Sequence, residues 1–330
     1  MPIKVRRLVL PMIVLLTVGG CEKAEVEPPV DSIEPTQQVQ SDTGDAAVPV
    51  SSWDSGAGLV FLVRDPEASS AMVVFPQYAD STLPDTVHFD RSLVRGRIVD
   101  VFNRAGFAGQ LRVDSMEMTT WAEGCIEWPT AVVSRLDSGL LRESWNTAFI
   151  AGRVRAVPLD SMESLSAADS ARLVVQLTRM ASVIPEASSS SFRGLPFVVR
   201  SAHRFTAAPG VQAVVSDIVR KVNLEANPLE EHTVLIAERA AGNEKGGGPW
   251  KTVYTERAAG VEERIETTDL LAAIRFGGGQ AGESEGTGAG ERTGLLVVRV
   301  GDETTGYSLI ERTRPGEWKV RWTSVRTGCG

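Results

Sequence analysis

The chain has 330 residues and a formal net charge of −8, with 42 acidic side chains against 34 lysines and arginines. This acidic balance argues against a nucleic-acid-binding protein, which needs clustered Lys and Arg, and against a body that lies flat on anionic lipid. The length suffices for one large domain or for two domains of ordinary size.

The N-terminus has the three-part pattern of a cleavable export signal. Lys4, Arg6 and Arg7 precede an apolar run of 11 residues, 8–18, which is followed by two glycines and Cys21. The run is much shorter than the ~20 residues that a transmembrane helix needs. Positive charge, a short apolar run and small residues in this order predict a signal peptide over residues 1–20.

The tetrapeptide Val18-Gly19-Gly20-Cys21 resembles the lipobox of bacterial lipoproteins. The resemblance implies that the leader is cut before Cys21, and that Cys21 carries acyl chains such as palmitate. Two or more chains anchor a protein stably, whereas one binds only marginally. The implied location is the bacterial cell envelope. Glu22 stands where an aspartate would resemble an inner-membrane retention signal, which favours the outer membrane, with the protein facing the periplasm. The alternative is an ordinary signal peptide with a chance cysteine, or a buried N-terminal strand.

Residues 21–51 are predicted to form the anchor and a disordered acidic linker. Residues 22–51 hold seven acidic side chains, one basic side chain, four prolines and no aromatic ring. Such a segment cannot bury enough apolar surface to offset the entropy of ordering it. We therefore expect a tether that holds the folded part on the order of 30 Å from the lipid.

The two cysteines that remain, Cys125 and Cys329, are a candidate disulfide pair in an oxidising compartment. The alternatives are two separately buried thiols or one reactive free thiol. Neither cysteine has the spacing of a zinc site.

The fold prediction is α+β: a mostly antiparallel β-sheet with two covering amphipathic helices. One β-rich half is expected at 52–185 and ends in a helix, and a second is expected at 186–330, with one continuous domain as the alternative. Short β-branched and aromatic runs between polar turns predict the strands, which are expected near 58–64, 71–76, 93–102, 110–118, 147–159, 195–205, 232–239, 250–257, 264–276, 294–300, 307–313 and 318–325.

The first covering helix is predicted at about 166–184, where Ser166 and Asp169 form a start signal and Pro185 a stop. The second is predicted at about 211–224, since six apolar residues from Val211 to Val222 recur at helical spacing. A Pro-Gly turn at 315–316 predicts a final hairpin. Its last strand should place Trp318, Val320 and Trp322 on one buried face.

No motif in the sequence indicates a cofactor, a metal or a catalytic residue. The three histidines, His88, His203 and His232, lie in no ligand-spaced cluster, and neither a Gly-x-Ser-x-Gly elbow nor a complete phosphate loop is present. The residues singled out for ligand contact are aromatic. Trp121, Trp128 and Trp250 could line a peptide- or glycan-binding face, although core packing is the usual role of large rings.

The leading functional hypothesis is therefore a non-catalytic binding or structural module, anchored to the membrane through acyl chains, with an envelope protein, peptide or glycan as partner. One alternative is an exported hydrolase whose active site is assembled from distant residues. A second is a helper of envelope assembly, which should expose an apolar patch or a sheet edge. A pocket with a histidine near both a carboxylate and a hydroxyl would favour the hydrolase, and a pocket lined with Trp and lacking such a group would favour binding.

Overall fold

The computed structural model describes residues 61–64, 70–74, 94–120, 127–136, 145–185, 190–222, 228–242, 248–277, 291–302, 304–324 and 326–328. The predicted leader, Cys21 and the acidic segment up to residue 51 lie outside these ranges, as do His88, Trp121, Cys125 and Cys329. The lipidation and the disulfide stay predictions. All described residues belong to one compact unit of the chain.

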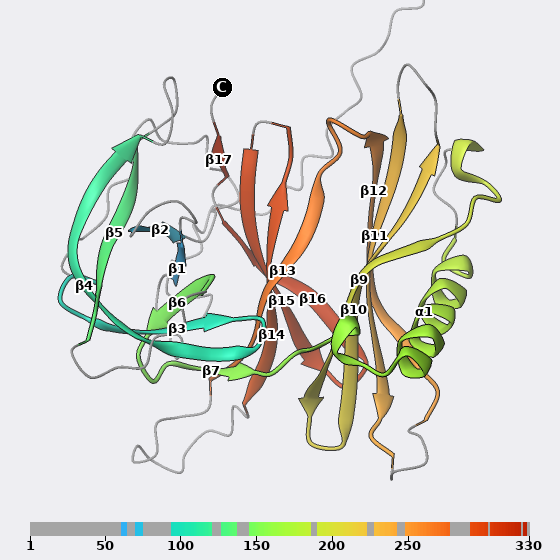
Figure 1. Ribbon diagram of the computed structural model, residues 1–330, viewed down its shortest axis with the longest axis horizontal. Helices are drawn as coiled ribbons and strands as arrows, with labels where there is room; N and C mark the ends of the chain where they lie inside the picture. Colours follow the sequence, from blue (N-terminus) through green and yellow to red (C-terminus); the bar gives the residue numbers. More distant parts are fainter. Residues whose placement is uncertain are drawn as a thin grey trace, which may run out of the picture. The chain divides into compact units, whose positions relative to one another are not determined.

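Six antiparallel strands in the N-terminal half close into a small β-barrel (Figure 1). Their order around the barrel is β1-β2-β5-β4-β3-β6. Apolar side chains that point inward, among them Val73, Val101 and Val113, fill the barrel. The strands are β1 (Phe61–Arg64), β2 (Ser70–Val74), β3 (Ile98–Asn103), β4 (Gly106–Thr120), β5 (Glu127–Arg135) and β6 (Thr147–Ile150).

Two further antiparallel sheets follow the barrel. The first, called here the five-stranded sheet, has the order β12-β11-β10-β9-β8. It consists of β8 (Asp160–Ser161), β9 (Val198–Ala208), β10 (Val211–Val222), β11 (Leu229–Ala240) and β12 (Lys251–Val261).

The second, called the six-stranded sheet, has the order β16-β15-β14-β13-β7, with β17 paired to β15. It consists of β7 (Val154–Val157), β13 (Thr267–Phe276), β14 (Arg292–Val300), β15 (Thr304–Arg314), β16 (Glu317–Thr323) and β17 (Thr327–Gly328). Strands β7 and β8, which precede residue 186, thus belong to the two sheets of the later segment.

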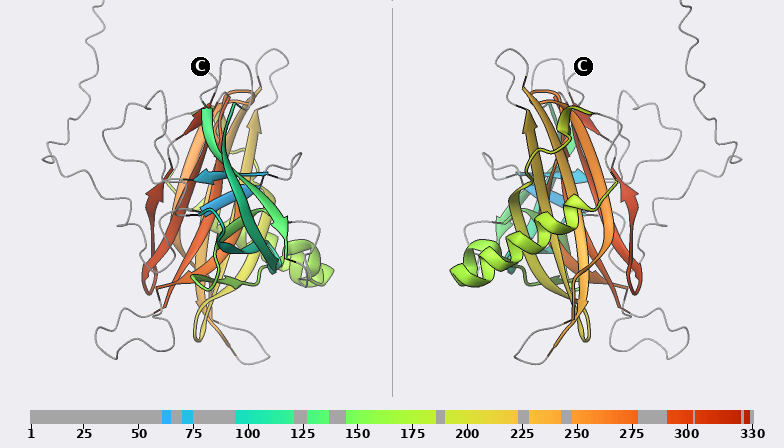
Figure 2. Two further views of the ribbon diagram at one scale, coloured as in Figure 1. Left: turned by 90° about the vertical axis from the view of Figure 1, so that its left-hand side faces the viewer. Right: turned by 90° about the vertical axis from the view of Figure 1, so that its right-hand side faces the viewer.

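Three apolar interfaces hold these layers together. Between the two sheets, side chains such as Phe205, Ile236 and Leu295 form one core. On the opposite face of the six-stranded sheet, Ile274 and other residues pack against barrel side chains. On the opposite face of the five-stranded sheet lies helix α1 (Ala167–Ser182), which Figure 2 shows running across the strands. Both sheets are therefore covered on both faces. Short 3-10 turns, η3 (Met162–Ser164) and η4 (Ser190–Phe192), flank α1.

Helix α1 confirms the first helix prediction. The Ser166 hydroxyl accepts a hydrogen bond from the backbone N–H of Asp169 at 3.2 Å, so it caps one of the free donors of the first turn. Leu173, Leu177 and Ala181, spaced four residues apart, are the buried residues of the helix and face the sheet.

The second helix prediction is wrong, because residues 211–222 form strand β10. Adjacent residues on a strand point to opposite faces, and here both faces are buried. Val215 packs between the sheets, whereas Val214 and Ile218 pack under α1. A strand covered on both sides loses the alternation of apolar and polar residues, and its apolar residues happened to recur at helical spacing.

The final hairpin is confirmed, with β15 and β16 joined at residues 314–317. The prediction for its rings is wrong, because Trp318 packs between the two sheets and Trp322 packs toward the barrel. The register shifts between Leu309 and Ile310, which pair with Trp322 and Val320, so an extra residue lies opposite them on β16. One extra residue turns the following side chains to the other face.

Within the described ranges, no helix combines the length and the apolar character that a membrane-spanning segment needs.

Gly294 on β14 gives a test of the packing between barrel and sheet. A Cβ at this position would lie 2.6 Å from Leu309 Cδ1 and 2.9 Å from Phe276 Cε1. We expect Gly294→Ala to lower the free energy of unfolding by about 1–3 kcal/mol through overpacking, as measured by urea denaturation. Gly260→Ala on edge strand β12 is the matched control, since the nearest atom would be 3.9 Å away. Equal losses in the two variants would contradict this packing.

Candidate functional site

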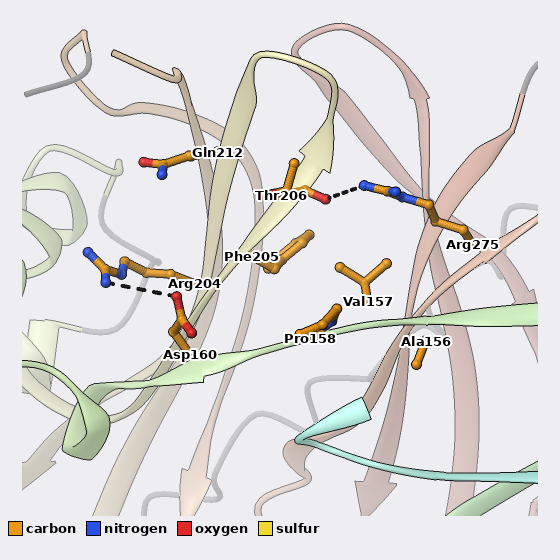
Figure 3. A pocket seen from close by; sticks show the side chains of 9 residues that line it. All are labelled: Ala156, Val157, Pro158, Asp160, Arg204, Phe205, Thr206, Gln212 and Arg275. Atoms are coloured by element: carbon orange, nitrogen blue, oxygen red, sulfur yellow. Dashed lines mark hydrogen bonds and ion pairs between the residues drawn. The ribbon is translucent and has the colours of Figure 1, made fainter. Parts of the chain in front are cut away.

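A cavity of about 450 Å³ lies where the chain crosses from β7 to β8, a volume within the usual range of small-molecule sites (Figure 3). The crossover contributes Val157 and Asp160, β9 contributes Arg204 and Phe205, and the opposite sheet contributes Arg275. The cavity thus draws its lining from both sheets and from the segment that joins them.

The shortness of β8 explains why there is space at this place. Strand β8 covers β9 through two residues only, with Asp160 opposite Arg204 and Ser161 opposite His203. Past Arg204, β9 continues to Ala208, and no strand within the described residues pairs with it on that side. A sheet edge without a neighbour presents free backbone groups. Here one of them, the Thr206 carbonyl oxygen, accepts a hydrogen bond from the Arg275 guanidinium at 3.0 Å.

Positive charge dominates the lining. The Arg204 guanidinium lies 4.0 Å from the exposed Asp160 carboxylate, at the outer limit of an ion pair. Arg275 bonds only to the neutral Thr206 carbonyl, and no ion pair to it is formed within the described residues. Two guanidinium groups therefore share a single carboxylate.

A third guanidinium stands behind the lining. Arg239 donates two hydrogen bonds to the Gln212 side-chain oxygen, at 2.9 and 2.7 Å, and lies over the Trp250 ring at 4.4 Å from its centroid. Burial, together with the nearby charge of Arg204, lowers the pKa of Arg239.

A second group of ionisable side chains surrounds His232 in the five-stranded sheet. Its Nε2 lies 2.8 Å from a Glu230 carboxylate oxygen and its Nδ1 lies 3.3 Å from Asp217. All three side chains are buried. Lys221 pairs with Glu230, and Arg200 lies 3.7 Å from Asp217.

This arrangement suits a structural ion cluster better than a metal site. The ring uses both nitrogens, so the two carboxylates lie at its opposite ends and do not converge on one point. In the part of the chain that the structure describes, no three His, Cys, Asp or Glu side chains are placed to hold a metal ion.

The three candidate tryptophans have different surroundings. Trp128 is 2% exposed and donates its ring N–H to the Val73 carbonyl at 2.7 Å, so it belongs to the core of the barrel side. Trp250 is partly exposed and stacks with Arg239 next to the cavity. Trp121 lies outside the described residues.

Neither of the two described histidines, His203 and His232, lines the cavity. His203 is buried on β9 directly before Arg204, and its Nδ1 has no hydrogen-bond partner among the described residues. Burial, and next the charge of Arg104, lower the pKa of His203, so the ring stays neutral.

Sequence reasoning missed the residues that line the cavity. Arg204, Gln212 and Arg275 come from three strands and carry no motif, and Gln212 stood in a segment that was predicted to be helical. The one sequence signal near them is the aromatic prediction at Trp250.

Comparison of the chain with protein-family models, with curated proteins and with solved structures found no match.

The His232 cluster predicts a pH-dependent contribution to stability. Burial alone would lower the pKa of His232, but the hydrogen bonds and charges of Asp217 and Glu230 raise it above its usual 6.5. A raised pKa stabilises the fold fully below the unfolded-state value, and this contribution is lost as the pH rises through the folded-state pKa. We expect the advantage of the wild type over His232→Gln to be largest near pH ~5.5 and smaller near pH ~8.5, at about 1.4 kcal/mol per unit of pKa difference.

Urea denaturation at the two pH values measures this effect. His203→Gln is the matched control, because the lowered pKa of His203 gives the opposite sign: this ring costs stability as the pH falls below ~6.5. The same pH trend in both variants would contradict the assigned environments.

Proposed function

We propose that this chain is an exported, lipid-anchored binding protein that holds a ligand in the cavity under the β7–β8 crossover. The observation that carries the proposal is the lining itself: Arg275 lies on the same side of β9 as the apolar Phe205 and Val157, while Arg204 and Gln212 border the cavity from the other side of that strand. Binding sites are concave and place a few polar groups among apolar side chains; this cavity joins four apolar residues with five polar or charged ones.

The cavity favours binding over hydrolysis. A general base must reach the proton that it removes, and a nucleophile must lie beside that base. The lining contains neither histidine nor cysteine, and its one carboxylate, Asp160, faces a guanidinium. His232 has both ring nitrogens engaged by carboxylates and is 4% exposed. These features support a site that holds its ligand unchanged.

The proposed setting is the bacterial envelope. Residues 1–20 would be removed, Cys21 would carry the acyl chains, and residues 22–51 would tether the folded unit on the periplasmic side of the outer membrane. The order of charge, apolar run, glycines and cysteine in the sequence supports this part of the proposal.

The anchor is tested by Cys21→Ser. Without the thiol no diacylglyceryl group can be attached, so we expect the variant to lose fatty-acid labelling and to leave the membrane fraction. Detergent partitioning and metabolic labelling in the native cell measure this. Cys125→Ser is the control and should still partition with the membrane. Unchanged partitioning of Cys21→Ser would contradict the anchor.

Ligand binding is tested by native mass spectrometry of protein extracted gently from its own envelope. We expect a bound small molecule on the wild type and its loss from the double variant Arg204→Ala/Arg275→Ala. Arg314→Gln removes one exposed guanidinium at the turn between β15 and β16, far from the lining in sequence, and should keep the molecule. A wild type without adduct, or an adduct that survives in the double variant, would count against the cavity as binding site.

A further inference from the structure

We infer that the ligand of this cavity is a small organic acid, one carboxylate on an apolar body; the inference rests on the proposed function. Two guanidinium groups, those of Arg204 and Arg275, border the cavity against the single carboxylate of Asp160. A ligand that complements this lining must bring acceptors and negative charge.

The guanidinium groups specify the kind of acceptor. A guanidinium presents its N–H groups in a planar fork that matches the two oxygens of a carboxylate, and such charge-assisted pairs are stronger than neutral hydrogen bonds. Arg275 uses one terminal nitrogen on the Thr206 carbonyl and has other N–H groups left. Because its protein partner is neutral, the charge of Arg275 is not compensated within the described residues. Figure 3 shows the Arg275 side chain on the Phe205 side of β9 and the Arg204 side chain extending away from the ring on the other side of that strand. Arg275 is therefore the guanidinium placed to pair with a carboxylate next to the ring.

The uncompensated charge extends behind the lining. Arg239 is also bonded to a neutral partner, Gln212, and a guanidinium over a ring such as Trp250 keeps its full charge. By contrast Arg155, which stands opposite Arg275 in the sheet, is paired with Glu291 at 3.6 Å. Guanidinium groups with neutral partners therefore come from both sheets, Arg275 from the six-stranded sheet and Arg239 from the five-stranded sheet.

Asp160 limits how much negative charge the ligand brings. A carboxylate beside Arg204 repels a nearby anion and competes for the same guanidinium. Its presence favours a singly charged carboxylate over a doubly charged phosphate.

The rest of the lining selects the body of the ligand. Phe205 is 5% exposed and packs edge-on to Trp318, with ring centroids 6.0 Å apart, so its position is fixed from behind. Val157, Pro158 and Ala156 continue this surface along the crossover. An apolar body that packs against these side chains is stabilised by the hydrophobic effect. A short acid such as acetate has too little apolar surface to gain this stabilisation.

Calorimetric titration of the purified mature protein in detergent tests the inference. The probes are N-acetyl-phenylalanine, octanoate, the neutral N-acetyl-phenylalaninamide and inorganic phosphate. We expect measurable binding of at least one acid, with the amide and phosphate at least ~10-fold weaker, since hydrogen bonds to charged groups are worth more than neutral ones. The tighter acid identifies a peptide-like or a fatty-acid-like body, and either supports the inference.

Three variants locate the effect. Arg275→Gln should weaken the acid at least ~10-fold, and Arg204→Gln should weaken it less because that side chain lies on the other side of β9, whereas Asp160→Asn should strengthen it several-fold by removing a nearby negative charge. The Asp160 variant keeps the test informative if an arginine variant does not fold. Arg314→Gln should bind as the wild type does.

Other results overturn the inference: no binding of either acid, equal binding of acid and amide, tighter binding of phosphate, or no effect of the three variants. Its failure is distinct from failure of the proposed function. If native mass spectrometry finds a cavity-dependent ligand while acid and amide bind alike, only the charge inference falls. If the acid binds through both arginines but the native protein carries no ligand, the proposed function falls.

Discussion

Burial of both faces of the two large sheets is the constraint on which the rest of the structure depends. The six-stranded sheet lies between the barrel and the five-stranded sheet, and the latter lies between its partner sheet and α1. Ionisable side chains on the central strands must then be paired, because an unpaired buried charge is far more costly than a pair. Arg220 and Glu231 are bonded through two contacts of 2.9 and 3.0 Å, and Glu238 accepts from Arg312 and from the Trp318 ring. The His232 cluster follows the same rule.

The cavity lies at the one place described here where this coverage is incomplete. All residues of β10 from Ala213 to Arg220 are buried, but β9 has a neighbour on its outer side over two residues only. The Arg275 side chain takes over the role of a missing strand by bonding the Thr206 carbonyl. A side chain can exchange one hydrogen-bond partner for another, whereas a paired strand cannot. The Arg275 guanidinium can therefore bind a ligand when one is present, and can bond the Thr206 carbonyl when none is bound.

The sequence predicted the class of the fold and failed at the interior of its sheets. Helix α1 was predictable because its outer face is polar and because local residues, Ser166, Asp169 and Pro185, mark its start and its end. Strand β10 was not predictable, because its burial on both faces depends on the neighbouring layers, which the sequence of the strand does not reveal. Strand β5 was overlooked, and its Pro129 lowers strand propensity.

Trp318 and Trp322 point to opposite faces of the sheet because of a register shift, which the composition of the strand does not reveal. Arg204 and Arg275 lie 71 positions apart, so only the pairing of the crossover brings them into one lining.

Net charge and local charge lead to different expectations about partners. A partner as large as nucleic acid responds to the potential of a wide surface, and a chain with a charge of −8 offers it little attraction. At physiological ionic strength, however, exposed charges more than about 8 Å away are largely screened. A small ligand inside the cavity therefore responds mainly to Arg204, Arg275 and Asp160, with Arg239 behind them. Three of these four groups are positive, so an acidic protein can hold an anion without contradiction.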